Sequence, residues 1–144
     1  MIEITENQTL TITPAIKELI RSLRNRGVLF ALDDFGTGYA NLCYLNELDL
    51  DVIKIDKTFI KAIKEVEQHI PMLESIIHLS ELLGLRMVAE GVEYGYQQQW
   101  LGKNNVDYLQ GYQFLPPVTF DDFMRYYKQS LDFFESASDS TFST

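Results

Sequence analysis

The chain has 144 residues, of which 46% are hydrophobic and 12% aromatic, enough for one globular domain with a buried core. The formal net charge of -9 argues against a general binding surface for DNA, RNA or an anionic membrane. Cys43 is the single cysteine, which excludes a disulfide framework, and no apolar stretch reaches the roughly 18 residues that span a bilayer. Because the N-terminus shows no signal-peptide pattern, we expect a cytoplasmic location.

Five short runs of apolar and β-branched residues alternate with helical patterns along the chain. Near-continuous apolar runs of this length are typical of parallel strands that are buried on both faces. The predicted strands are Ile2–Thr5, Val28–Leu32, Asp51–Ile55, Leu85–Ala89 and Tyr108–Tyr112.

The segments between these runs carry helix signals. Thr13 is a suitable N-cap before Pro14, apolar residues recur at helical spacing, and Gly27 ends the pattern, which predicts a helix over Thr13–Arg26. The other predicted helices are Gly38–Leu48, Lys57–Lys64, Ile70–Leu83, Tyr96–Lys103 and Phe120–Phe134. We expect residues 1–134 to form a single domain portion without an internal linker and the Ser- and Thr-rich residues 135–144 to be a disordered tail.

Strands that alternate with helices leave two architectures open, a doubly wound sheet and a closed (β/α)8 barrel. No Gly-x-Gly-x-x-Gly pattern follows a strand, so the dinucleotide-binding form of the open sheet lacks its signature. Polar residues near the ends of successive strands favour the barrel, where strand ends converge on one mouth. A complete barrel has about 250 residues. We therefore predict an α/β fold that is the C-terminal portion of a TIM-like barrel, with about five parallel strands and flanking helices.

The polar residues at these strand positions form a candidate metal centre. Adjacent carboxylates at the end of a buried strand resist ionisation unless a cation or a proton lies between them. Carboxylates suit Mg²⁺ or Mn²⁺, and two such ions about 4 Å apart are a common arrangement for cleaving a phosphodiester. A nearby lysine could stabilise the attacking hydroxide or the charge that develops on phosphorus. The candidates are Glu3, Asp33, Asp34, Lys54 and Glu90, with Gln110 as a weaker one.

Several of these residues also have a structural interpretation. Asp33 and Asp34 could start a turn, because Asp favours turns. Lys54 could be a structural residue, although a lysine buried in a parallel strand requires a carboxylate partner. Glu90 and Glu93 could be loop charges.

Five segments resemble, in order and spacing, the EAL-domain family of cyclic di-GMP phosphodiesterases. The match runs from residue 2 to about residue 128. The segments are IEITE, ALDDFGTGYANL, DVIKIDKTFI, VAEGVE and YLQGYQFLPP. The resemblance implies a TIM-like barrel that hydrolyses cyclic di-GMP to linear pGpG with two Mg²⁺ or Mn²⁺ ions.

The resemblance also implies a role for each matching residue. Lys54 matches the lysine that contacts the water nucleophile, and Glu90 matches the glutamate proposed as general base or as partner of the metal water. The implied metal ligands are Glu3, Asp33 and Asp34. The implied loop and supporting residues are Glu6, Glu93 and Gln110. Of these, Glu6 would hold the loop that follows the paired aspartates, and Gln110 would lie beside the metal water.

The chain lacks the Glu-Ala-Leu motif that gives the family its name, together with a further Asn ligand. Two hypotheses stay open: a portion of an active hydrolase that is inactive alone, or a non-catalytic EAL-like module that binds a nucleotide or a protein. Five strands cannot close a barrel, so we expect unpaired edges at the first and last strands. We therefore expect a homodimer when the chain is produced alone; contact with a missing N-terminal portion or a rearranged sheet are the alternatives.

Overall fold

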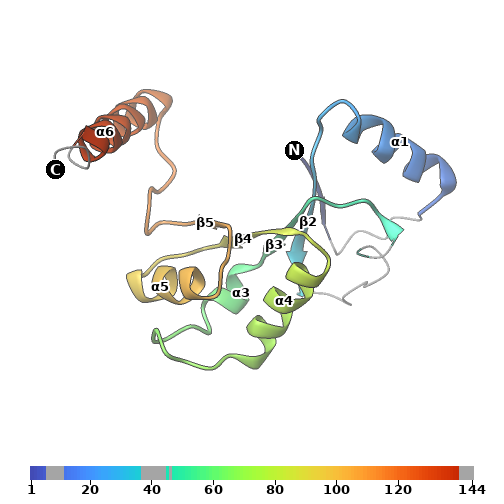
Figure 1. Cartoon of the computed structure of the whole chain (residues 1–144), viewed down its shortest axis with the longest axis horizontal. Helices are drawn as coiled ribbons and strands as arrows, with labels where there is room; N and C mark the ends of the chain where they lie inside the picture. The colour runs from blue at the N-terminus through green and yellow to red at the C-terminus, as the bar shows by residue number, and fades with distance from the viewer. Residues whose placement is uncertain (6–11, 37–44, 46, 140–144) are drawn as a thin grey trace. The chain divides into compact units, whose positions relative to one another are not determined.

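The computed structural model in Figure 1 describes residues 1–5, 12–36, 45 and 47–139. Five strands form one sheet in chain order, and all neighbouring strands are parallel. They are β1 (Ile2–Thr5), β2 (Phe30–Phe35), β3 (Val52–Ile55), β4 (Arg86–Glu90) and β5 (Tyr108–Gln110). The predicted α/β fold with five parallel strands is thereby confirmed, and among the described strands β1 and β5 do not pair to close a barrel.

The helices begin where the sequence favours it. The side chain of Thr13 caps α1 (Pro14–Arg24) by accepting a hydrogen bond from Ile16 N at 3.3 Å. Helix α4 (Pro71–Leu82) also begins at a proline, whose fixed φ suits the first turn. The other helices are α3 (Lys57–Ile60), α5 (Gly95–Lys103) and α6 (Phe120–Asp139).

Helix α3 ends at Ile60, whereas the sequence pattern predicts its end at Lys64. The side chain of Gln68 explains the difference. Its Oε1 accepts a hydrogen bond from Lys64 N at 2.8 Å, and its Nε2 donates to Ala62 O at 3.2 Å. These bonds offer the backbone an alternative to the helical ladder.

The chain divides into two compact units, Met1–Phe114 and Leu115–Thr144. In the second unit, α6 continues to Asp139 and so includes residues that the sequence assigns to a disordered tail. No Pro or Gly interrupts residues 120–139, so nothing in the backbone chemistry stops the helix at Phe134. The predicted helix Gly38–Leu48 lies almost entirely outside the described residues. Within the described ranges, no helix is long and apolar enough to cross a membrane.

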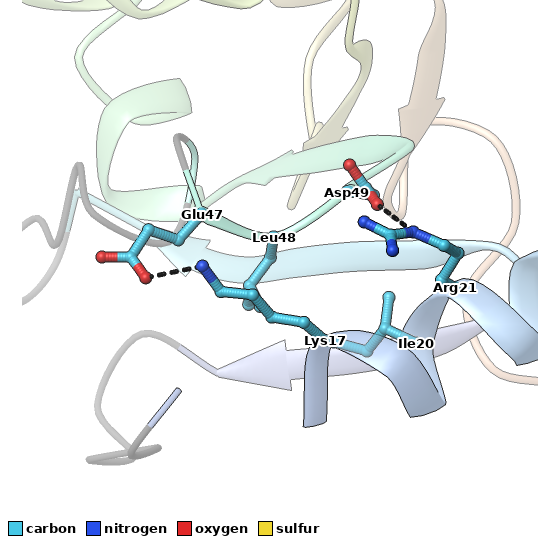
Figure 2. A pocket seen from close by; sticks show the side chains of 6 residues that line it. All are labelled: Lys17, Ile20, Arg21, Glu47, Leu48 and Asp49. Atoms are coloured by element: carbon cyan, nitrogen blue, oxygen red, sulfur yellow. Dashed lines mark ion pairs between the residues drawn. The ribbon is translucent and has the colours of Figure 1, made fainter. Parts of the chain in front are cut away.

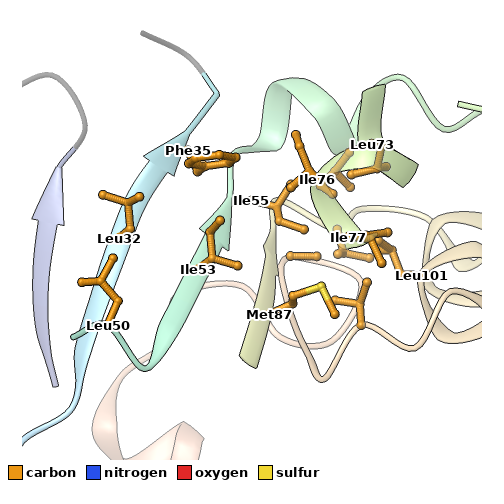
Figure 3. Close-up of a cluster of buried hydrophobic side chains, with 14 of the residues drawn as sticks. Leu32, Phe35, Leu50, Ile53, Ile55, Leu73, Ile76, Ile77, Met87 and Leu101 are labelled. Carbon is orange, nitrogen blue, oxygen red and sulfur yellow. The ribbon is translucent and has the colours of Figure 1, made fainter. Parts of the chain in front are cut away.

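The hydrophobic core of the first unit lies on one face of the sheet (Figure 3). Leu32, Ile53 and Met87 are in register on neighbouring strands, and all three are buried. Leu73 of α4 and Leu101 of α5 belong to the same buried cluster. Because side chains alternate between the faces of a strand, the residues next to these core positions lie on the opposite face.

Candidate metal centre

The strand registers bring one predicted site residue from each strand to the face opposite the core. Lys54, for example, is in register with Val88 of β4. Glu90 lies two positions after Val88, so it points to the same face of the sheet as Lys54. Glu90 is in turn in register with Gln110 of β5. The residues on this face are Glu3, Asp33, Lys54, Glu90 and Gln110.

Asp34 reaches the same site through an irregularity in β2. In a regular strand, Asp33 and Asp34 would point to opposite faces. The register between β2 and β3 shifts between Leu32 and Phe35, and Asp34 has a φ of 55°, which is uncommon for a residue other than glycine. Carboxylate oxygens of Asp33, Asp34 and Glu90 consequently lie within 4.8 Å of one another. Left-handed backbone of this kind costs about 1–3 kcal/mol and occurs preferentially at functional sites.

Lys54 lies buried among carboxylates from three other strands. Its Nζ is 2.8 Å from Glu90 Oε1, 3.0 Å from Glu3 Oε1 and 3.0 Å from Asp33 Oδ1. Burial acts to lower the pKa of Lys54, but the contacts with Glu90, Glu3 and Asp33 outweigh it and raise the pKa above its usual value. Lys54 is therefore a permanent cation at neutral pH.

The acidic residues of this centre fit a divalent cation. Lys54 brings one positive charge to a group of four carboxylates, those of Glu3, Asp33, Asp34 and Glu90. Asp33 Oδ1 is buried, and apart from its ion-pair contact with Lys54 it forms no hydrogen bond with any described residue. Converging carboxylate oxygens are the ligands that Mg²⁺ and Mn²⁺ prefer. Asp33, Asp34 and Glu90 are thus the residues that could hold such an ion.

A cavity of about 330 Å³ adjoins this acidic cluster. Glu93 and Gln110 are exposed and line the cavity together with Glu90, so they lie beside the cluster of metal-ligand candidates rather than within it. The predicted residue Glu6 lies outside the described residues. The sequence analysis missed two lining residues, Lys57 and Tyr112, although each follows the end of a strand that carries a predicted site residue.

A smaller cavity of about 150 Å³ lies between α1 and the residues that lead into β3 (Figure 2). Lys17 Nζ lies 3.0 Å from Glu47 Oε2, and Arg21 Nε lies 3.9 Å from Asp49 Oδ2. The charged side chains of this cavity therefore neutralise one another. Because Asp49 precedes β3, whereas the acidic cluster lies toward the C-terminal ends of the strands, the cavity is separate from the metal centre.

The chain is similar to EAL domains over most of its length. The sequence profile of the EAL domain matches residues 1–117. The cyclic di-GMP phosphodiesterase PdeL of Escherichia coli is 40% identical over 126 residues, which cover 86% of this chain and 34% of that protein. The crystal structure of the EAL domain of Mycobacterium smegmatis DcpA has a TM-score of 0.74 at 32% identity, covering 84% of this chain and 54% of that one.

A further solved structure is Klebsiella pneumoniae BlrP1 in a manganese/cy-diGMP complex. It has a TM-score of 0.64 at 32% identity and covers 78% of this chain and 29% of that one. The chain spans 25% to 34% of the length of the first curated relatives it matches. EAL domains are TIM-like barrels, and the five-stranded parallel sheet matches that fold. The chain belongs to the EAL domain family.

Proposed function

We propose that the acidic cluster is part of a phosphodiesterase site that hydrolyses cyclic di-GMP to linear pGpG. The observation that carries this proposal is the convergence of Asp33, Asp34 and Glu90 within 4.8 Å at one end of a parallel sheet. The relatives support the substrate, since PdeL is a cyclic di-GMP phosphodiesterase and BlrP1 was solved with manganese and cy-diGMP.

Each residue of the centre would have a distinct task. A complete site would hold two Mg²⁺ or Mn²⁺ ions. When bound, these ions supply Lewis acidity and lower the pKa of the water that they bind. Asp33 and Asp34 would hold the metal, with Glu3 as a further ligand. Lys54 would place its positive charge beside the attacking water. Glu90 could hold the ion together with Asp33 and Asp34, with which its carboxylate converges, or act as the general base, 2.8 Å from Lys54. As the base it would accept the proton of the attacking water while the water oxygen bonds to phosphorus and the bond from phosphorus to the ribose oxygen breaks, and solvent would supply the proton of that leaving oxygen.

The residues that line the cavity would contact the rest of the substrate. Gln110 and Glu93 lie beside Glu90 and would orient the water and support the metal ligands. Lys57 offers a cation to a phosphate, and the exposed ring of Tyr112 offers a face on which a guanine base could stack. These contacts would make the cavity the binding site for one half of the dinucleotide.

The sequence contains only part of the metal-ligand set that the family resemblance implies. We therefore expect the 144-residue chain by itself to hydrolyse cyclic di-GMP slowly, because the loss of even outer partners of a metal site costs about 10- to 100-fold. The second candidate function is a non-catalytic EAL-like module that binds cyclic di-GMP or a protein. The unclosed sheet of the described residues favours this alternative for the chain in isolation.

The test is chromatographic detection of pGpG after incubation of cyclic di-GMP and Mn²⁺ with the natural protein that contains this chain. The comparison variant is Asp33→Asn combined with Asp34→Asn, and the control is Glu47→Gln, which changes a carboxylate in the separate small cavity. We expect pGpG from the wild type and the control but not from the double variant. Binding of cyclic di-GMP without pGpG would favour the non-catalytic module, and equal turnover by all three would refute the assigned site.

We further propose that the chain acts in the cytoplasm and associates with a partner through the edges of its sheet. Among the described strands, β1 pairs only with β2 and β5 only with β4, which leaves one edge of each available. Edges of this kind are seldom left bare. Self-association into a homodimer or contact with another segment of the protein would cover them, and sedimentation velocity of the chain alone tests the first possibility.

A further inference from the structure

Gln97 is a buried amide that links three elements of the first unit. Its side chain lies in the first turn of α5 and is 2% exposed. Its Oε1 accepts hydrogen bonds from Glu93 N at 2.8 Å and Tyr94 N at 3.1 Å. Its Nε2 donates to Ile60 O at 3.0 Å. One side chain thereby joins the loop after β4 to the end of α3.

The two segments that Gln97 joins each continue directly from a residue of the metal centre. The loop follows Glu90, the last residue of β4. Helix α3 follows β3, which carries Lys54, after the single residue Asp56. Asp56 is itself fixed, because its Oδ1 accepts a hydrogen bond from Thr58 N at 2.8 Å. A change in the spacing of loop and helix would therefore be transmitted to the spacing of Glu90 and Lys54.

Further contacts hold the same loop against β5 and against the start of α3. Val92 is fully buried; its N–H donates to Gln110 O at 3.0 Å, and its carbonyl oxygen accepts from Gln113 N at 2.9 Å. Gly91 has a φ of +69°, and a Cβ there would lie 2.6 Å from Lys57 Cβ. The loop thus lies tightly between β5 and α3, with Gln97 as the side chain that fastens it to α3.

We propose that Gln97 is a positioning residue of the metal centre, which fixes Glu90 relative to Lys54 by tying the loop after β4 to α3. The proposal rests on the proposed function only in so far as the centre binds a divalent cation. Residues beyond the direct ligands orient those ligands, and their loss typically lowers metal affinity about 10- to 100-fold. The side-chain hydrogen bonds of Gln97 join backbone groups of Glu93, Tyr94 and Ile60, none of which is a candidate metal ligand, so its effect would be transmitted through the backbone.

The test compares three variants of the chain. Gln97→Met keeps the length of the side chain and removes all three hydrogen bonds, whereas Gln97→Glu keeps the acceptor oxygen and loses the donation to Ile60 O. The control is Trp100→Phe in the same helix, which is 2% exposed and loses one hydrogen bond, from Nε1 to Gln68 O at 2.7 Å. The measurements are Mn²⁺ affinity by calorimetry, hydrogen exchange of the Glu93 and Tyr94 amides, and the melting temperature.

We expect Gln97→Met to weaken Mn²⁺ binding about 10-fold or more and to accelerate exchange at Glu93 and Tyr94. Gln97→Glu should retain more of that protection, because it still accepts from both amides. Trp100→Phe should leave the Mn²⁺ affinity within about twofold of wild type, even if its melting temperature falls as far as that of Gln97→Met.

Equal Mn²⁺ affinity of Gln97→Met and wild type would overturn the proposal, as would an equal loss in Trp100→Phe, which would point to general destabilisation. A wild-type chain that does not bind Mn²⁺ would contradict the proposed metal centre instead. In that case hydrogen exchange would be the test of the positioning role of Gln97. Unchanged exchange of the Glu93 and Tyr94 amides in Gln97→Met would overturn that role.

Discussion

Replacing Lys54 with methionine removes the cation on which the carboxylates converge. The Glu3 side chain is 41% exposed, so its contact with Lys54 contributes less than about 1 kcal/mol. The side chains of Asp33 and Glu90 are only 16% and 22% exposed, and removing one partner of a buried pair costs about 3–5 kcal/mol. We expect Lys54→Met to lower the free energy of unfolding by about 3–5 kcal/mol at neutral pH without divalent cations.

Urea unfolding of the chain in the presence of a chelator measures this loss, with the fluorescence of the single tryptophan, the buried Trp100, as the signal. The matched control is Lys17→Met. Lys17 Nζ also lies 3.0 Å from a carboxylate, that of Glu47, but the two side chains are 41% and 43% exposed. This exposed pair should contribute less than about 1 kcal/mol. Equal losses of stability in the two variants would refute the reasoning from burial.

The difference in the free energy of unfolding between wild type and Lys54→Met should also depend on pH in a defined way. Because the pKa of Lys54 in the folded chain is raised above 10.5, its stabilising contribution is complete below that value and is lost only as the pH rises through the folded pKa. The difference between wild type and Lys54→Met should therefore be constant from about pH 7 to pH 9. Mn²⁺ should narrow the difference, because it supplies the missing positive charge to the carboxylates. A difference that disappears by pH 9 would contradict the raised pKa.

Two further predictions concern the supports of the sheet. Gly111→Ala should destabilise the chain, because a Cβ there would lie 2.1 Å from the carbonyl oxygen of Val92. In α5, a Cβ at Gly102 would meet no atom within 4 Å, so Gly102→Ala should stabilise the chain by up to about 1 kcal/mol. Equal melting temperatures of the two variants would contradict this prediction. Asp51→Asn should cost about 1 kcal/mol at neutral pH, because it weakens the 2.7 Å contact with Arg24, whose side chain is 36% exposed so that water screens the pair. Burial acts to raise the pKa of Asp51, but hydrogen bonds from Arg24 and a backbone amide lower it overall, so its contribution is complete above an ordinary aspartate pKa and is lost as the pH falls through the lower folded value. Urea unfolding at a series of pH values tests this, and a constant wild-type advantage down to about pH 2 would be the contrary result.

The order and approximate places of the five strands could be predicted from the sequence, because they depend on local apolar patterns. The first strand has the predicted bounds, Ile2–Thr5, and α1 begins at the proline that marks its start. The second strand runs over Phe30–Phe35 rather than the predicted Val28–Leu32. Its end was not predictable in this way, since the left-handed backbone of Asp34 lies where the register against β3 shifts, and that pairing is a tertiary feature. The role of Gln97 was equally hidden, because its partner Ile60 lies 37 positions away in the chain.

The central claim is that Asp33, Asp34 and Glu90 form a divalent-cation site, and titration of the chain with Mn²⁺, followed by the electron paramagnetic resonance of the free ion, tests it most directly. Asp34→Asn is the decisive variant, because asparagine tolerates the left-handed backbone while it removes the charge. We predict saturable binding by the wild type and by the control Glu47→Gln, and an affinity at least about 10-fold weaker in Asp34→Asn. Equal Mn²⁺ affinity in all three proteins would contradict the claim.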